Sequence, residues 1–241
     1  MRTIKSISFS DLKRIFNGRK FTRRLTQAAN ETLKYWDETQ FNVVRTLSDG
    51  KLIYGDVVSK SDVLDEPDSS VGGFFLDGVE ELIEKENLNI YAGEVFPLIV
   101  YHTHPSTSSS DPSPDDISGM AILRSWTYDL GYGPRYDNRP LFIIGSVPNR
   151  KRLDLLVLQE KLDTPMGEFI AEQIPDFVGM DRDYDPKNND TIARLYDLRP
   201  ELNAALLSYQ RNGNGLYRIS NEELAKLERF SYFPTMLPEK S

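Results

Sequence analysis

The chain has no cysteine and only two histidines, His102 and His104, among its 241 residues. The lack of cysteine excludes disulfides, thiolate nucleophiles and cysteine-ligated zinc or iron–sulfur sites, and it is compatible with a reducing compartment. A metal site in this protein must therefore use histidine, aspartate or glutamate. No stretch approaches 18 consecutive apolar residues, and residues 1–10 lack the apolar run of a signal peptide. We therefore expect a cytoplasmic protein with no membrane partner.

Positive and negative charges are unevenly distributed along the chain. The first 24 residues carry a net charge of +7, whereas the whole chain carries −8, so the remainder carries −15. A strongly acidic part of the chain repels the phosphate backbone of nucleic acid, so we expect no nucleic-acid partner. We interpret residues 1–20 as a basic N-terminal arm whose cations lie in solvent or pair with the acidic body.

The composition, 39% hydrophobic and 27% charged, is typical of a folded protein with one main domain and an appendage. Apolar spacing predicts a helix over residues 21–36 and a shorter one over 76–87. β-rich runs at 38–46 and 51–58, on either side of the turn signal at 48–50, predict a hairpin. Further strands are predicted at 96–102, 141–146 and 153–158.

Two regions complete the predicted organisation. A Ser-, Asp- and Pro-rich loop over residues 105–114 precedes a helix predicted over 115–130. From residue 164 onward the pattern is helical and irregular, so we expect residues 164–241 to form a helical C-terminal extension. Its predicted helices cover 166–173, 191–195, 201–209 and 221–230, with a polar stretch at 181–189.

His102 and His104 stand at the end of a predicted buried strand. Side chains at positions i and i+2 of a strand point to the same face, so both imidazoles can converge on one ion. Zinc binds histidine nitrogen at about 2.0–2.1 Å, and a catalytic zinc site has three protein ligands and an open water position. Because no histidine remains, the third ligand must be a carboxylate: Asp116 is the first choice, and Asp111 and Asp115 are alternatives.

The segment His102-Thr103-His104-Pro105, followed by Ser113-Pro114-Asp115-Asp116, resembles the JAMM motif of the JAB1/MPN metalloprotease family, in particular its prokaryotic JAB-like, deubiquitinase-type members. The family commonly has six residues between the proline and the serine, and this chain has seven. Keeping the Ser-x-x-Asp spacing makes Asp116 the ligand, whereas keeping the loop length would make it Asp115. Ser113 and Asp116 would also suit a helix N-cap with an acid in the first turn.

The resemblance implies the fold, the metal and the roles of individual residues. It implies an α/β domain of MPN/JAMM type, cytidine-deaminase-like, over residues 21–163, with a curved mixed sheet flanked by helices. It further implies one Zn²⁺ bound by His102, His104 and Asp116, with Ser113 donating a hydrogen bond to the oxyanion. Glu38 resembles the family's strand-start glutamate and would be the general base. In the family's Glu-Thr-Gly-Gly run, this chain has Gln40 and Phe41 in place of the two glycines.

The implied activity is hydrolysis of an amide bond at the C-terminus of ubiquitin or of a ubiquitin-like or sulfur-carrier protein. With both histidines used as ligands, no imidazole is left to act as a base, so a Ser-His-Asp triad is excluded in practice. The alternative is a catalytically inactive MPN-type scaffold that binds protein partners. The sequence does not indicate an oligomeric state.

Overall fold

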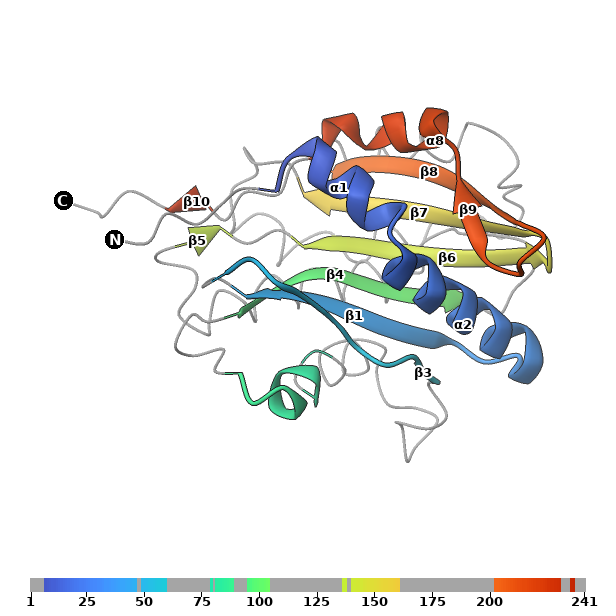
Figure 1. Ribbon diagram of the computed structural model, residues 1–241, viewed down its shortest axis with the longest axis horizontal. Helices are drawn as coiled ribbons and strands as arrows, with labels where there is room; N and C mark the ends of the chain where they lie inside the picture. Colours follow the sequence, from blue (N-terminus) through green and yellow to red (C-terminus); the bar gives the residue numbers. More distant parts are fainter. Residues whose placement is uncertain are drawn as a thin grey trace, which may run out of the picture.

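The computed structural model describes residues 7–46, 49–59, 79, 81–88, 95–104, 136–137, 140–160, 202–230 and 235–236. The described part is a mixed α/β structure in which helices pack on a curved, eight-stranded mixed sheet (Figure 1). At this level the fold class predicted from the sequence is confirmed. Helices include α1 (Phe9–Phe16), α2 (Arg19–Tyr35) and α8 (Asn221–Ala225), which a 3₁₀ turn, η3 (Lys226–Arg229), extends.

Strand order in the sheet is β2-β1-β4-β6-β7-β8-β9, and β3 also pairs with β1. Their bounds are β1 (Thr39–Thr46), β2 (Leu52–Tyr54), β3 (Val58–Ser59), β4 (Val95–His104), β6 (Leu141–Asn149), β7 (Arg152–Glu160), β8 (Leu202–Arg211) and β9 (Tyr217–Ile219). β5 (Tyr136–Asp137) pairs with β10 (Thr235–Met236) in a separate two-stranded sheet. The hairpin predicted around residues 48–50 and the strands predicted in β4, β6 and β7 are confirmed.

One pair of neighbouring strands is parallel, β4 and β6, whereas β4 is antiparallel to β1 on its other side. Parallel neighbours need a crossover connection, since a tight turn cannot return the chain to the same end of the sheet. The chain that leaves β4 after His104 therefore crosses over before it enters β6 at Leu141. The histidines thus stand at the strand end from which this crossover starts.

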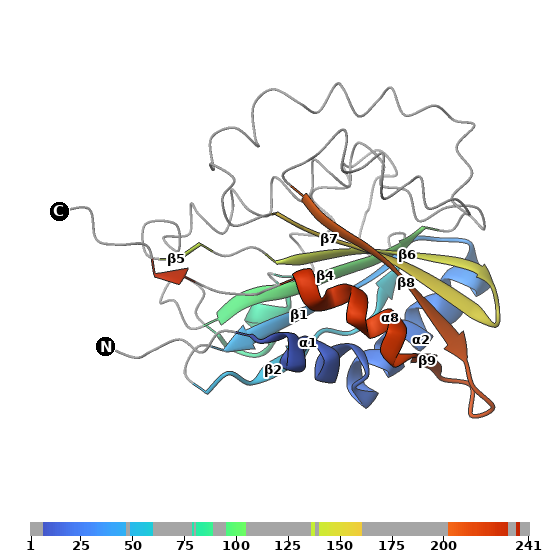
Figure 2. The same ribbon diagram turned by 90° about the horizontal axis from the view of Figure 1, so that it is seen from above.

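One part of the hydrophobic core lies between the sheet and the helices. Figure 2 shows α1, α2 and α8 together on one side of the sheet. A chain of aromatic contacts links the two layers, with ring centroids 5.0 Å apart for Phe16 and Phe21, 5.7 Å for Phe21 and Phe41, and 4.6 Å for Phe41 and Tyr101. We call this side the helix-covered face; it carries Phe41, Val43, Ile99, Tyr101, Ile143, Val157 and Leu207.

Gly145 is required by the packing of this face. A Cβ atom at this position would lie 2.5 Å from the Tyr101 hydroxyl oxygen, so no larger residue fits without displacing the ring. Tyr101 is fully buried, and its burial raises the pKa of the phenol well above its usual range. The neutral ring therefore serves as core here.

The basic N-terminal arm predicted over residues 1–20 is not a solvated tail throughout. Residues 9–16 form α1, which packs into the core. A capping box begins the helix: Asp11 N–H donates to Ser8 Oγ at 3.2 Å, and Ser8 N–H donates to the Asp11 carboxylate at 3.0 Å. Leu12 and Phe16 are fully buried. The lysines and arginines of this segment lie on the other side of an amphipathic helix, which composition alone does not distinguish from a solvated tail.

The helix predicted over residues 201–209 is wrong, because residues 202–211 form β8. This strand pairs with β7 along its length, from Gln159 opposite Asn203 to Leu153 opposite Tyr209. β8 continues through β9, which belongs to the same sheet. The described part of the predicted helical extension is therefore a strand pair followed by a short helix. The helix predicted over 221–230 is confirmed as α8 and η3, with Ser220 Oγ capping Glu223 N–H at 3.2 Å.

The remaining predicted helices have mixed outcomes. α2 confirms the helix predicted over 21–36, and residues 79 and 81–85 are helical, as predicted. The helices predicted over 115–130, 166–173 and 191–195 lie outside the described residues. In the described part of the chain, no helix is long and apolar enough to cross a membrane.

Candidate metal centre

β4 brings both histidines to one place. This strand is buried over its first nine residues, and His104 at its end is partly exposed. His102 is fully buried, and its ring centroid lies 5.4 Å from that of Phe142 on β6. The His102 ring is thus fixed by packing, whereas the His104 ring borders solvent.

The two imidazoles converge through the same nitrogen. The Nε2 atoms of His102 and His104 lie 3.1 Å apart, and the ring centroids lie 5.0 Å apart. Two nitrogens that each lie about 2.0–2.1 Å from one ion at this separation subtend about 100° at it, near the tetrahedral angle of about 109°. The pair therefore fits two ligand positions of a zinc site.

Glu38 lies just before β1, the strand beside β4. Gln40 stands directly opposite His102 in the antiparallel register, and side chains opposite each other share a face of the sheet. Position 38 is two residues before Gln40, so alternation continues to the same face, next to His104. Glu38 is partly exposed, and its Oε2 atom is buried. The register thus places position 38 on the side of the sheet that carries the histidines, and one of its carboxylate oxygens is buried.

The residues on this side of the sheet are collectively named the histidine face, which carries Gln40, Asn42, Val100, His102, His104, Phe142 and Ile144. Gln40 and Asn42 are 0% and 2% exposed, and they alternate with Phe41, which enters the opposite core. Sequence reasoning missed these two amides. The signal was available, because Glu38, Gln40 and Asn42 form a period-two polar series in a strand whose intervening residues are Thr39 and Phe41.

A cluster of three threonine hydroxyls fixes the backbone behind the histidines. Thr103, between the two histidines, points to the helix-covered face, where its Oγ1 lies 2.9 Å from Thr39 Oγ1. Thr32 of α2 joins both, at 3.0 Å from Thr39 and in contact with Thr103. Thr39 N–H also donates to Thr103 Oγ1 at 3.1 Å. Because all three are buried, the cluster ties α2, β1 and β4 together at the level of the site.

The other predicted site residues, Ser113 and Asp116, lie outside the described residues, as do the alternatives Asp111 and Asp115. Among the residues that the structure describes, no group of three or more histidine, aspartate or glutamate side chains is placed to hold a metal. The structure thus brings the two predicted histidine ligands together, and the sheet register places the predicted base, Glu38, on the same side of the sheet. A complete ligand set needs a third side chain from elsewhere in the chain.

Comparison with known proteins gives no independent indication of the chemistry. No family model matches the chain, and no match is found among curated proteins.

Proposed function

We propose that the protein is a zinc-dependent peptidase of the MPN/JAMM type, with residues 21–163 as its catalytic domain. The observation that carries this proposal is the convergence of His102 Nε2 and His104 Nε2 at 3.1 Å on the face that Glu38 shares. A pair of core histidines would not need to point the same nitrogen at one another beside a carboxylate. The motif that contains both histidines supplies the reaction class.

His102, His104 and Asp116 would hold the zinc, of which we expect one per chain. When bound, zinc acts as a Lewis acid on the scissile carbonyl and lowers the pKa of water toward about 7. Both histidines must then be neutral at Nε2, which leaves Nδ1 to carry the proton in each ring. The site thus needs no histidine as a base.

Glu38 would move the proton. In amide hydrolysis the C–N bond breaks, a C–O bond to the water oxygen forms, and one water proton goes to the leaving amine. The Glu38 carboxylate would accept that proton and then donate it to the amine, a role that contributes about 10²–10⁴-fold to the rate in comparable enzymes. Ser113 would donate a hydrogen bond to the developing oxyanion, and such a contact is worth about 2.7–4 kcal/mol.

The substrate class follows from the motif resemblance. We propose an amide or isopeptide bond at the C-terminus of ubiquitin or of a ubiquitin-like or sulfur-carrier protein. The scissile bond would lie at the end of β4, where His104 borders solvent.

The experiment compares wild type with Glu38→Gln and with the control Glu228→Gln, an exposed glutamate on η3. Metal content is measured by mass spectrometry, and turnover is measured on fusions that carry a C-terminal amide on ubiquitin and on a sulfur-carrier protein. We expect wild-type zinc content in all three proteins and a loss of turnover of about 10²–10⁴-fold in Glu38→Gln alone. If purified wild type held no transition metal and could not be loaded with one, a non-catalytic scaffold would be the better account.

A further inference from the structure

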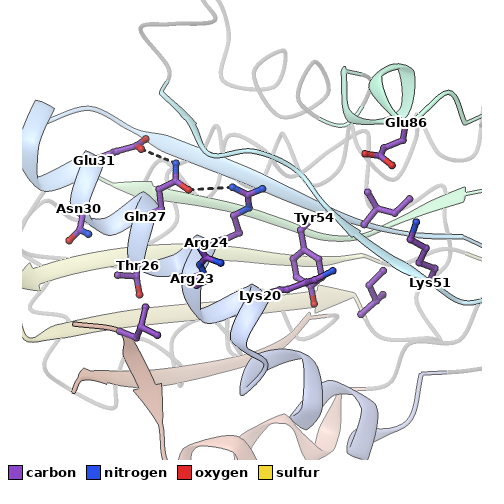
Figure 3. A pocket seen from close by; sticks show the side chains of 13 residues that line it. Lys20, Arg23, Arg24, Thr26, Gln27, Asn30, Glu31, Lys51, Tyr54 and Glu86 are labelled. Atoms are coloured by element: carbon purple, nitrogen blue, oxygen red, sulfur yellow. Dashed lines mark hydrogen bonds between the residues drawn. The ribbon is translucent and has the colours of Figure 1, made fainter. Parts of the chain in front are cut away.

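A second site candidate lies on the helix-covered side of the sheet, away from the histidines. A groove of about 760 Å³ runs along α2 and over the edge strand β2 (Figure 3). Leu52 and Tyr54 of β2 form part of its lining, and their side chains share the face of Val43. The volume is within the range of about 300–1,000 Å³ that is usual for small-molecule sites.

Three cations that form no ion pair with a described residue line this groove. Lys20 and Arg23 of α2 and Lys51 beside β2 make no ion pair with any described residue, whereas Arg24 is paired with Asp56 at 2.9 Å. Lys20 Nζ lies 6.0 Å from the centroid of the Tyr54 ring, which holds the ammonium above the lining of the groove.

This arrangement of charge is unfavourable for the free protein. Lys20, Arg23 and Arg24 are spaced i, i+3 and i+4 on one helix, and like charges at these spacings destabilise a helix. Acids are abundant elsewhere, since the chain carries a net charge of −8, yet α2 has no acid in its first turn. An anionic ligand would remove this repulsion.

The groove lining also includes carboxylate and amide side chains. Gln27 Nε2 donates to Glu31 at 3.0 Å, and Arg24 donates to Gln27 Oε1 at 3.3 Å, with the Glu31 carboxylate lining the groove (Figure 3). The Asn30 amide oxygen accepts a hydrogen bond from Arg211 Nη2 at 3.0 Å. Glu86 lines the groove on the side of Lys51. The carboxylates of Glu31 and Glu86 accept hydrogen bonds and repel anions. The parts of the groove beside them therefore suit hydroxyl or amino donors of a ligand.

We propose that this groove binds a phosphorylated small molecule that also carries hydroxyl or amino donors, as a nucleotide or a sugar phosphate does. The phosphate would lie among Lys20, Arg23 and Lys51, and the donors would meet Glu31 and Gln27. A longer polyanion fits less well, because residues beyond the first 24 carry −15 and would repel a continuing backbone. The site is separate from the candidate metal centre and does not depend on it.

Isothermal titration calorimetry of the full chain with ADP, ribose 5-phosphate and inorganic pyrophosphate, in chelator, tests the proposal. We expect ADP or ribose 5-phosphate to bind with a Kd below about 1 mM. Replacing Lys20, Arg23 and Lys51 together with alanine should weaken binding at least tenfold. The control replaces Arg150, Lys151 and Arg218, which are exposed cations outside the groove lining, and should change Kd by less than twofold.

Two further variants separate the parts of the proposal. Glu31→Gln should weaken binding of the donor-bearing ligands and leave pyrophosphate binding unchanged. His104→Ala should leave all three affinities unchanged, so that a failure of the metal centre is not mistaken for a failure of this site. The proposal is overturned if none of the three compounds saturates, if pyrophosphate binds as tightly as ADP, or if both triple variants lose binding equally. It is also overturned if polyglutamate or single-stranded DNA binds the groove cations more tightly than ADP.

Discussion

The two faces of the sheet bury different chemistry with the same strands. On the helix-covered face, Phe41 and Tyr101 stack with ring centroids 4.6 Å apart, and α1 and α2 close over them. On the histidine face the neighbouring residues of the same two strands are Gln40 and His102, both fully buried. Alternation along β1 and β4 therefore places an aromatic core on one side and buried polar groups, among apolar neighbours such as Val100 and Phe142, on the other.

The two faces differ in the free energy that burial of their side chains costs. Transfer of an amide into the interior without a hydrogen bond costs about 1–3 kcal/mol in proteins. Asn42 Oδ1 is buried and has no hydrogen-bond partner in the described part of the chain, although an apolar residue at this position would pack without that cost. Polar residues on the histidine face are thus unexplained by folding alone, whereas each residue of the aromatic chain on the other side is explained by packing.

The largest difference between the two faces is expected when the histidines are replaced. His102→Ala and His104→Ala should each abolish zinc binding, because two remaining protein ligands seldom hold a catalytic zinc. The fold should persist in His104→Ala, whose side chain borders solvent, whereas loss of the fully buried His102 ring beside Phe142 should also lower stability. Zinc content by mass spectrometry and helix and strand content by circular dichroism measure the two effects. Retention of stoichiometric zinc in either variant would contradict the ligand assignment.

The third ligand can be identified by a matched pair of substitutions. Asp116→Asn should weaken zinc binding by at least about a hundredfold, more than the loss of an outer partner of a ligand. Asp115→Asn should leave zinc binding nearly unchanged, and both variants should change stability by about 1 kcal/mol at most through a helix dipole. Zinc titration against a chelating dye gives the affinities. The reverse order would assign the ligand to Asp115 and the extra loop residue to the other side of Ser113.

Thr103→Val tests whether stability and zinc binding depend on different faces, because Thr103 stands between the two histidines and points to the opposite face. Valine keeps the shape and removes a hydroxyl shared with Thr32 and Thr39, which should cost about 1–3 kcal/mol of unfolding free energy. Zinc content should stay at the wild-type level. Urea denaturation measures the first quantity, and a variant of normal stability that fails to hold zinc would show that the hydroxyl cluster serves the site directly.

The smallest expected effect is at the turn between α2 and β1. Trp36 ends α2 in the left-handed region, with φ 57°, and its side chain is 60% exposed. Glycine adopts this conformation without strain, so Trp36→Gly should stabilise the fold by about 0.5–1 kcal/mol. Denaturant titration measures this gain. A clear loss of stability would show that the indole contributes packing that exceeds the backbone strain.

Local pattern was sufficient for much of the fold. Helix α2 and strands β1, β4, β6 and β7 have clear periodicities, and each was predicted close to its observed bounds. β8 was not, because Ala204, Ala205, Leu206 and Leu207 are strong helix formers, and only pairing with β7 makes them a strand. Such pairing is a long-range contact that no local window contains.

The candidate site was predictable to a similar degree. The spacing of His102 and His104 predicts a shared face, and the structure shows their Nε2 atoms together. The position of Glu38 beside them depends on the register of β1 against β4, which follows from the whole sheet. The buried amides of Gln40 and Asn42 went unnoticed because polar residues in a strand are usually assigned to a solvated face.

The strained turn at Trp36 gives the protein an optical reporter. Indole emission shifts with the polarity of its surroundings, and this ring is largely in water two residues before Glu38. The sequence has one other tryptophan, Trp126, so a Trp126→Phe variant leaves a single fluorophore beside the candidate site. Arrival of a protein substrate next to Glu38 then becomes visible as a spectral change in an unlabelled chain, at concentrations and times that a cleavage assay does not reach.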